Sequence, residues 1–335
     1  LNMHYANLST DRQYSPSFPK STCEPCSDFF NEQEVFHVLD RLKPTATGLD
    51  GLPVWFIRLA APALAKPLAL LFNLSLREAV IPEQWKTACI SPIPKIPQPR
   101  ECSDFRPISI TPVLSRVMEK LLIRRIVYPA LQLDTVSPAF TDQYAFRPTG
   151  STTAALTAIL DDLSEMSQLY PYVQIVALDF SKAFDTVRHC TLLDKIRKFP
   201  LPDFFYNWII DYFTGRQHCT KSSGKVSTPQ PINASVVQGS ALGPIAFIIN
   251  ATDLKAITPG NKLHKYADDT YLLVPSDNCN TTPSELINIS QWAEINNLNL
   301  NTKKSQIMIV SKHTPPIIPH HLQYQMLRRL PHSTS

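Results

Sequence analysis

The stretch "KLHKYADDTYLLVP", residues 262–275, places two adjacent aspartates between two segments typical of β-strands. Tyr266, Tyr271 and the apolar run 272–274 favour a half-buried, pleated setting. Asp268 and Asp269 do not, because aspartate is depleted in strands and costly to bury without a partner. Neighbouring side chains on a regular strand point to opposite faces, so the pair fits best at the turn of a hairpin. The stretch therefore predicts a hairpin that carries carboxylates at its turn.

A third carboxylate follows another apolar strand, because "YVQIVALDF", residues 172–180, reaches Asp179 near its end. Carboxylates brought together at the ends of separate strands form an all-oxygen site suited to Mg²⁺. Two such ions about 3.5–4 Å apart can activate an attacking oxygen and stabilise a leaving phosphate oxygen. Plainer interpretations also fit each motif alone: a solvated turn for the "ADD" motif and a helix N-cap for Asp179. Asp185 is a further candidate ligand, but its placement in a helical pattern favours a surface or structural role.

Composition sets broad limits on the class of protein. The chain has 335 residues, 44% of them apolar and 18% charged, which permits a substantial core and argues against wholesale disorder. The net charge of +4 permits a polyanionic partner without requiring one. No apolar run approaches a membrane span, and the odd count of seven Cys favours reduced thiols and an intracellular setting. Cys23 and Cys26 lack a second pair for zinc, and His320 and His321 are interpreted as part of a solvated tail.

The order of expected elements favours an α+β fold. Residues 1–27 are rich in Ser, Pro, Thr and Asn and predict a flexible tail or linker. Helical patterns cover 31–42, 61–82, 111–131, 151–169, 180–196, 202–217, 242–254 and 283–298. Strand patterns cover 85–94, 105–110, 172–180, 217–237, 262–275 and 305–311. Helices and strands mix without regular alternation, so a doubly wound sheet is not expected.

The motifs resemble the reverse transcriptase of non-LTR (LINE-like) retrotransposons. "ALDFSKAFDTV", "VVQGSALGPIAF", "KYADDTYLL" and "NLNLNTKKSQIMIV" occur in the family's order and spacing. Upstream, "TGLDGLPVWFIR", "WKTACISPIPK", "DFRPISITPVLSRVMEKLLIRRI" and "AFRPTGSTTAAL" resemble the family's extended fingers segments. The resemblance runs from about residue 30 to residue 311. It implies a right-hand polymerase fold with an antiparallel palm sheet flanked by helices: a tail at 1–27, fingers at 28–150, palm at 151–311 and a tail at 312–335, with the thumb largely missing.

The resemblance also implies roles for individual residues. The implied metal ligands are the carboxylates of Asp179, Asp268 and Asp269 and the backbone carbonyl of Phe180. Lys304 matches a lysine near the leaving pyrophosphate and a proton donor, with Lys303 as a competitor for that role.

The implied nucleotide-binding residues are Lys95 and Arg106 for the triphosphate, Phe184 as the aromatic gate against a 2′-hydroxyl, and Gln238 and Gly239 in the nucleotide pocket. Without the family, a solvated loop lysine is the better interpretation of Lys95, whereas Phe184 fits a helix core equally well. Arg147 is expected to support template or loop geometry. Arg116, Arg124 and Arg125 either follow the template backbone or form the solvated face of a helix.

The implied reaction is RNA-templated addition of deoxynucleotides to a DNA 3′-hydroxyl with two Mg²⁺ ions, for which Mn²⁺ can substitute. The implied partners are an RNA template, a DNA primer or target and a dNTP, without a membrane, in the cytoplasm and nucleus. Two rivals stay open: another two-metal enzyme, such as an RNA polymerase or a nuclease, and a truncated, catalytically inactive nucleic-acid-binding remnant.

The sequence departs from the family at several points. Ala145 stands where Gly is common, and Gln306 where an acidic residue is common. A primer-gripping hairpin and a helical thumb are not recognisable in 312–335, and no endonuclease segment precedes the polymerase motifs. These departures predict an excised or truncated copy.

Overall fold

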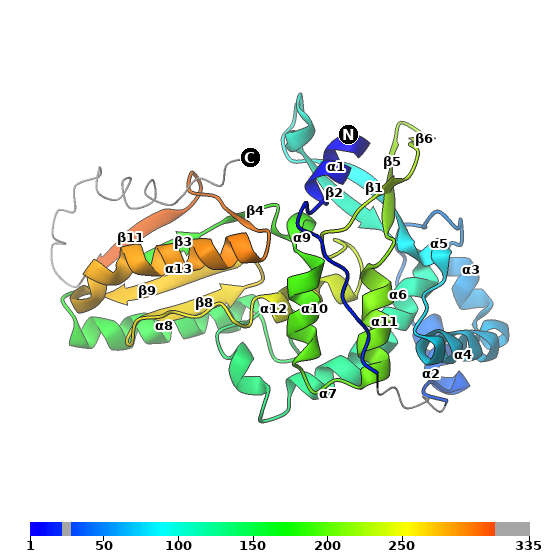
Figure 1. Ribbon diagram of the computed structural model, residues 1–335, viewed down its shortest axis with the longest axis horizontal. Helices are drawn as coiled ribbons and strands as arrows, with labels where there is room; N and C mark the ends of the chain where they lie inside the picture. Colours follow the sequence, from blue (N-terminus) through cyan, green and yellow to red (C-terminus); the bar gives the residue numbers. More distant parts are fainter. Residues whose placement is uncertain (22–27, 312–335) are drawn as a thin grey trace. The chain divides into compact units, whose positions relative to one another are not determined.

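The computed structural model describes residues 1–21 and 28–311, and it divides into two compact units (Figure 1). The first unit combines Leu1–Gln132 with Phe184–Ala246, and the second combines Leu133–Ala183 with the chain from Phe247 onward. Helices mix with two main sheets, which confirms the predicted α+β class. Residues Cys23, Cys26, His320 and His321 and the predicted tail 312–335 lie outside the described residues.

The first unit is built mainly from helices. They are α1 (Asn2–Leu8), α2 (Glu32–Asp40), α3 (Val54–Leu59), α4 (Ala61–Glu78), α5 (Glu83–Lys86), α6 (Val113–Leu122), the π-helical turn η2 (Ile123–Val127), α7 (Tyr128–Leu131), α10 (His189–Arg197) and α11 (Asp203–Phe213). The predicted amphipathic helix after residue 31 is α2, which begins with a capping box between Asn31 and Glu34 and buries Val35 and Leu39.

A mixed sheet belongs to the same unit. Its strands are β1 (Thr87–Pro94), β2 (Phe105–Ile110), β5 (Gln217–Ser222), β6 (Lys225–Val226) and β7 (Gln230–Pro231), with the short helix η1 (Cys102–Asp104) between β1 and β2. The order is β2-β1-β5-β6, and β7 also pairs with β5. Strand β1 is antiparallel to β2, with Ile93 opposite Arg106, and parallel to β5. The strand, loop and extended return predicted for 85–110 are confirmed.

The second unit contains the four-stranded antiparallel sheet that holds Asp179, Asp268 and Asp269. Its order is β11 (Gln306–Ser311), β3 (Tyr172–Leu178), β9 (Asp269–Pro275) and β8 (Lys262–Tyr266). A separate ladder joins β4 (Phe180–Ser181) to β10 (Asn299–Leu300). The remaining elements are η3 (Ser137–Phe140), α8 (Thr152–Leu169), α9 (Ala183–Thr186), α12 (Leu242–Asn250), η4 (Ser276–Thr281) and α13 (Thr282–Ile295); α9 and α12 cross the boundary between the units.

Helices α8 and α13 cover the two faces of this sheet (Figure 1). On one face Val173 and Ile175 form a buried cluster with Met166 of α8. On the other face Gln174 accepts a 2.7 Å hydrogen bond from Thr282, at the start of α13. Since side chains alternate along a strand, burial on both faces explains why β3 reads as a continuous apolar run.

The flexible tail predicted for residues 1–27 is wrong for residues 1–21. Tyr5 of α1 is buried, the Arg188 guanidinium lies 2.7 Å from the Asp11 carboxylate, and the Lys20 ammonium lies 2.9 Å from Asp203. These contacts attach the polar N-terminal segment to the rest of the first unit.

The single helix predicted after Asp179 is also wrong, because it is divided. Strand β4 follows Asp179 directly, α9 begins only at Ala183, and α10 begins at His189. Asp179 is therefore the residue between two strands, and its interpretation as a helix N-cap is excluded.

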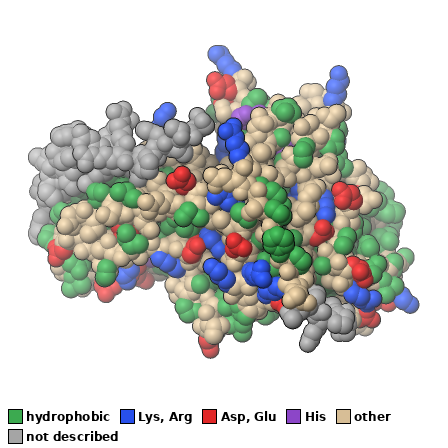
Figure 2. Space-filling view, in the orientation of Figure 1, with side chains coloured by type: hydrophobic (Ala, Val, Ile, Leu, Met, Phe, Trp, Pro, Cys, Tyr) green, Lys and Arg blue, Asp and Glu red, His purple; other side chains and the backbone are tan. Residues whose placement is uncertain are grey.

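Charged side chains of both signs are interspersed on the face shown in Figure 2, as the small net charge suggests. Among the described residues, no helix has the length and apolarity needed to cross a bilayer.

Candidate metal and nucleotide site

The predicted hairpin around Asp268 is confirmed. Strands β8 and β9 pair up to Tyr266 opposite Asp269, so Ala267 and Asp268 form a two-residue turn. Ala267 has φ of 58°, in the left-handed region that two-residue hairpin turns require at their first position. Asp268 is half-buried and Asp269 is exposed, so the turn presents its carboxylates at the end of the sheet.

The register of the sheet brings Asp179 to the same end. Leu178 of β3 lies opposite Thr270 of β9, where the paired register ends, and Asp179 and Asp269 are the residues next to this last pair. The electrostatics agree, because partial desolvation of the carboxylate, and then the charge of Asp179, raises the pKa of Asp269 even though the residue as a whole is exposed. Two of the three predicted carboxylates are therefore close enough to repel each other.

Lys304 lies beside Asp179. Its ammonium is 3.9 Å from the Asp179 carboxylate, and its side chain is 70% exposed. The preceding loop holds Asp179 through its backbone, because the Asn301 N–H donates to the Asp179 carbonyl at 2.7 Å. The exposed ammonium is thus placed by a loop that is itself attached to the end of β3.

The fit of these groups to a metal ion rests on the paired carboxylates. Asp179 and Asp269 supply hard oxygen donors, and a divalent cation would relieve their repulsion, which adds to desolvation in raising the pKa of Asp269. Within residues 1–21 and 28–311, no group of three or more His, Cys, Asp or Glu side chains converges as a metal site. The adjoining Phe180 is buried, with its ring 5.9 Å from that of Trp292.

Gln238 and Gly239 belong to a turn in the first unit that is attached to β2. The Ser109 N–H donates to the Gln238 carbonyl at 2.9 Å. Gly239 has φ of 123°, and a Cβ there would lie 2.0 Å from the Ser109 carbonyl oxygen. Only glycine fits this close approach to the Ser109 backbone. A cavity of about 20 Å³ beside Gln238, lined also by Tyr5 and Asp185, has room for about one water molecule rather than a nucleotide.

Lys95 and Arg106 lie at the end of the β1–β2 pair that the loop 95–104 connects, and both are exposed. The Lys95 ammonium donates to the Ser103 carbonyl at 2.8 Å. Phe184 begins the first unit's second segment; it is half-buried, and its carbonyl accepts from the Val236 N–H at 2.8 Å. The structure thus groups Asp179, Asp269 and Lys304 in the second unit, whereas the five predicted nucleotide-binding residues belong to the first.

Glu119, which supports the turn after Gln238, was not predicted from the sequence. Its carboxylate is fully buried and accepts hydrogen bonds from the Ala241 N–H at 2.7 Å, the Leu242 N–H at 3.1 Å and the Ser115 hydroxyl at 2.9 Å. Burial raises the pKa of Glu119 despite these bonds. The carboxylate joins α6 to the turn that follows Gln238. Its position on the apolar face of an amphipathic helix was a signal that could have identified it.

Comparisons with known proteins agree with the motifs. The family described as reverse transcriptase (RNA-dependent DNA polymerase) matches residues 93–327. The RNA-directed DNA polymerase from mobile element jockey of Drosophila melanogaster is 29% identical over 88% of this chain and 34% of its own length. Its counterpart from Drosophila funebris is 31% identical over 81% of this chain and 31% of its own length.

A probable RNA-directed DNA polymerase from transposon X-element of Drosophila melanogaster is 29% identical over 74% of this chain and 28% of its own length. The chain therefore spans about a third of the length of these relatives. Among solved structures, a telomerase from Candida tropicalis truncated from its C-terminal domain aligns with a TM-score of 0.49 and 13% identity, over 70% of this chain and 52% of that one. On the family match, the chain belongs to the reverse transcriptase (RNA-dependent DNA polymerase) family, with homologues in non-LTR retrotransposons, and has that family's polymerase fold.

Proposed function

We propose that this chain catalyses RNA-directed DNA synthesis for a non-LTR retrotransposon, adding deoxynucleotides to a DNA 3′-hydroxyl. One observation carries the proposal within this family: Asp179 and Asp269 end adjacent antiparallel strands and are close enough for the charge of one to raise the pKa of the other. Repelling carboxylates at a strand end are stable when a cation neutralises them, which is the arrangement that phosphoryl transfer uses.

Asp179, Asp268, Asp269 and the backbone carbonyl of Phe180 would hold two Mg²⁺ ions, with Mn²⁺ as a substitute. When bound, the metal activates the attacking oxygen and neutralises charge on the phosphates. Lys304, exposed and 3.9 Å from Asp179, would donate a proton to the leaving pyrophosphate.

The nucleotide would be bound by the residues of the first unit. Lys95 and Arg106 are exposed at one end of the β1–β2 pair, and the Arg fork suits a triphosphate. Gly239 lets the backbone approach the ligand closely, Gln238 lines the pocket, and Phe184 selects against a 2′-hydroxyl.

We infer that the chain divides into fingers at 28–150 and a palm at 151–311. These two subdomains would bind the RNA template and the DNA primer. Arg124 is an exposed cation able to follow a template backbone. Arg125 is paired with Glu34 at 2.9 Å, and Arg116 donates to Thr45 at 2.9 Å, so both already have partners within the chain.

Primer extension on an RNA template with Mg²⁺ tests the proposal. We expect extension by the native chain with dNTPs and a loss of at least 10³-fold in Asp179→Ala, because the reaction depends on the metal site. A binding remnant would retain nucleic-acid affinity without any extension, and Asp268→Asn would then change nothing. Equal incorporation of ribonucleotides would instead support an RNA polymerase and contradict the role given to Phe184.

A further inference from the structure

The turn with Asp268 is held from outside its own hairpin. Strand β8 is the edge of its sheet, and residues 142–144 cover that edge close to the turn. The Lys265 N–H donates to the Asp142 carbonyl at 2.6 Å, and the Tyr144 N–H donates to the Lys265 carbonyl at 2.9 Å. These residues extend the sheet by one short parallel rung, next to the catalytic turn.

The Gln143 side chain continues from this rung into the turn itself. It is 1% exposed, and its Oε1 accepts from the N–H groups of Ala267 and Ala145, both at 3.0 Å. Ala267 has a positive φ, which is costly for an L-residue without support from its surroundings. In the described part of the chain, Gln143 Nε2 has no hydrogen-bond partner, so the polar contacts of this side chain are those accepted by its oxygen.

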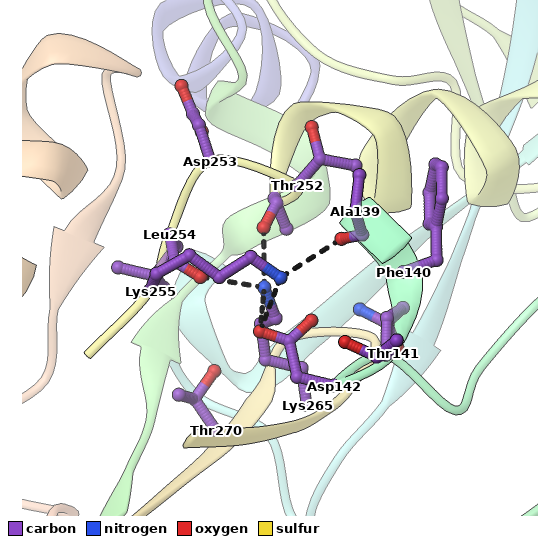
Figure 3. Close-up of polar contacts among 12 residues, drawn as sticks. Ala139, Phe140, Thr141, Asp142, Thr252, Asp253, Leu254, Lys255, Lys265 and Thr270 are labelled. Carbon is purple, nitrogen blue, oxygen red and sulfur yellow. Dashed lines mark hydrogen bonds and ion pairs between the residues drawn. The ribbon is translucent and has the colours of Figure 1, made fainter. Parts of the chain in front are cut away.

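Lys265 anchors the same strand from the interior. It is 1% exposed, and its ammonium lies 2.7 Å from the Ala251 carbonyl, 2.8 Å from the Leu254 carbonyl and 3.1 Å from the Asp142 carboxylate (Figure 3). Three acceptors match the three donors of an ammonium.

The Lys255 ammonium approaches the same Asp142 oxygen at 2.8 Å and also donates to the Ala139 carbonyl at 3.0 Å (Figure 3). Burial lowers the pKa of Lys265 to about 8, and the Asp142 charge opposes that shift. Residues 251–255 after α12, residues 139–142 and β8 are thus joined by one cluster around Asp142 and the buried Lys265 within the second unit.

We infer that Gln143, supported by Asp142 and Lys265, is a positioning residue that fixes the Ala267–Asp268 turn and so sets where the metal-binding carboxylates lie. Its catalytic consequence rests on the proposed function. Gln143 contacts no reacting atom; it acts through the Ala267 N–H, and a displacement of about 1 Å at a reacting group can cost about 100-fold in rate.

Two replacements of Gln143 distinguish the role of its acceptor oxygen from the role of its side-chain volume. Gln143→Met keeps a similar volume but removes the acceptor, whereas Gln143→Glu keeps an oxygen that can accept both N–H bonds. We expect Gln143→Met to lower kcat about 100-fold with little change in KM for dNTP, and to raise the Mg²⁺ concentration that gives half-maximal activity. Gln143→Glu should stay within about tenfold of the native chain on both measures.

Hydrogen–deuterium exchange of peptides within 262–275 gives a readout that does not require activity. We expect the Ala267 amide to exchange at least 10-fold faster in Gln143→Met and to be unchanged in Gln143→Glu. Met166→Ala is the matched control, because it removes a buried side chain that packs against Val173, Ile175 and Leu273 rather than against the turn.

Unchanged exchange in Gln143→Met, or equal acceleration in Met166→Ala, would refute the positioning role. If the native chain extends no primer, the proposed function fails, while the exchange comparison still decides whether Gln143 holds the turn.

Discussion

Replacing Glu119 is expected to show that a buried acceptor, rather than a buried charge, holds the turn after Gln238. Glu119→Ala removes the acceptor of the Ala241 and Leu242 N–H groups and of the Ser115 hydroxyl. Each buried N–H left without a partner costs about 1–3 kcal/mol, so the two together cost about 4 kcal/mol. At about 2–4 °C per kcal/mol, the first unit should melt about 8–16 °C lower.

Glu119→Gln should behave differently. One oxygen, Oε2, accepts both backbone N–H bonds, and an amide oxygen can do the same while its NH₂ donates to Ser115. Because burial raises the pKa of Glu119, folding shifts its protonation equilibrium toward the neutral form. The contribution of protonated Glu119 to the free energy of unfolding is complete below the ordinary carboxyl pKa. It is lost as the pH rises through the pKa that Glu119 has in the folded state. The Gln variant should therefore match or exceed the native stability, and its advantage should be larger at pH 8 than at pH 5.

The assay is thermal and urea unfolding of the native chain, Glu119→Gln and Glu119→Ala at both pH values, with KM for dNTP measured alongside. We expect KM to rise in Glu119→Ala, because the unsupported turn directly follows Gln238. If Glu119→Gln lost as much stability as Glu119→Ala, the negative charge would be the stabilising element and the explanation from acceptors would be refuted.

Three further predictions concern single sites. Asp269→Asn should raise Tm at pH 7 in the absence of metal, because the native pKa is raised by burial and by a like charge, and it should abolish any stabilisation by Mn²⁺ seen in the native chain; a fully retained Mn²⁺ effect would contradict the site. Burial lowers the pKa of His189 to about 4, so on acidification the unfolded chain binds a proton before the folded chain does. The free energy of unfolding should therefore fall by about 3 kcal/mol between pH 6.5 and 4. Denaturation curves across this range test the prediction, and His189→Gln should lose this pH dependence. Gly239→Ala should raise KM for dNTP at least 10-fold, because its Cβ would collide with the Ser109 carbonyl; steady-state kinetics would contradict the argument if KM were unchanged.

The parts of the fold that local patterns determine could be predicted from the sequence. The aspartate pair in an apolar hairpin predicted the turn at Asp268, and the continuous apolar run predicted β3. The same local reasoning failed for residues 1–21, because their polar composition conceals an ion pair between Asp11 and Arg188, 177 positions apart. Composition carries no information about such a partner.

The residues of the candidate site also fall into a set that was predicted from the sequence and a set that was not. The residues expected to do chemistry, such as Asp179 and Lys304, were predicted from short motifs, and the structure brings these two side chains to within 3.9 Å of each other. Glu119 and Gln143 were not found, because each acts by accepting a backbone N–H more than 120 positions away. An acidic or amide side chain on an otherwise buried stretch is the signal that could have identified them.

Neither compact unit is a continuous stretch of chain, and this connectivity affects biosynthesis. During translation, β1 cannot meet its parallel neighbour β5 until about 130 more residues have been made, which takes roughly 6–26 s at 5–20 residues per second. Until then, one edge of β1 lacks its native partner strand, β5, while the ribosome synthesises the intervening residues. A nonsense codon anywhere in residues 133–216 would release a product in which that partner strand never arrives, so such products should be recovered as aggregates or degradation fragments rather than as stable half-molecules.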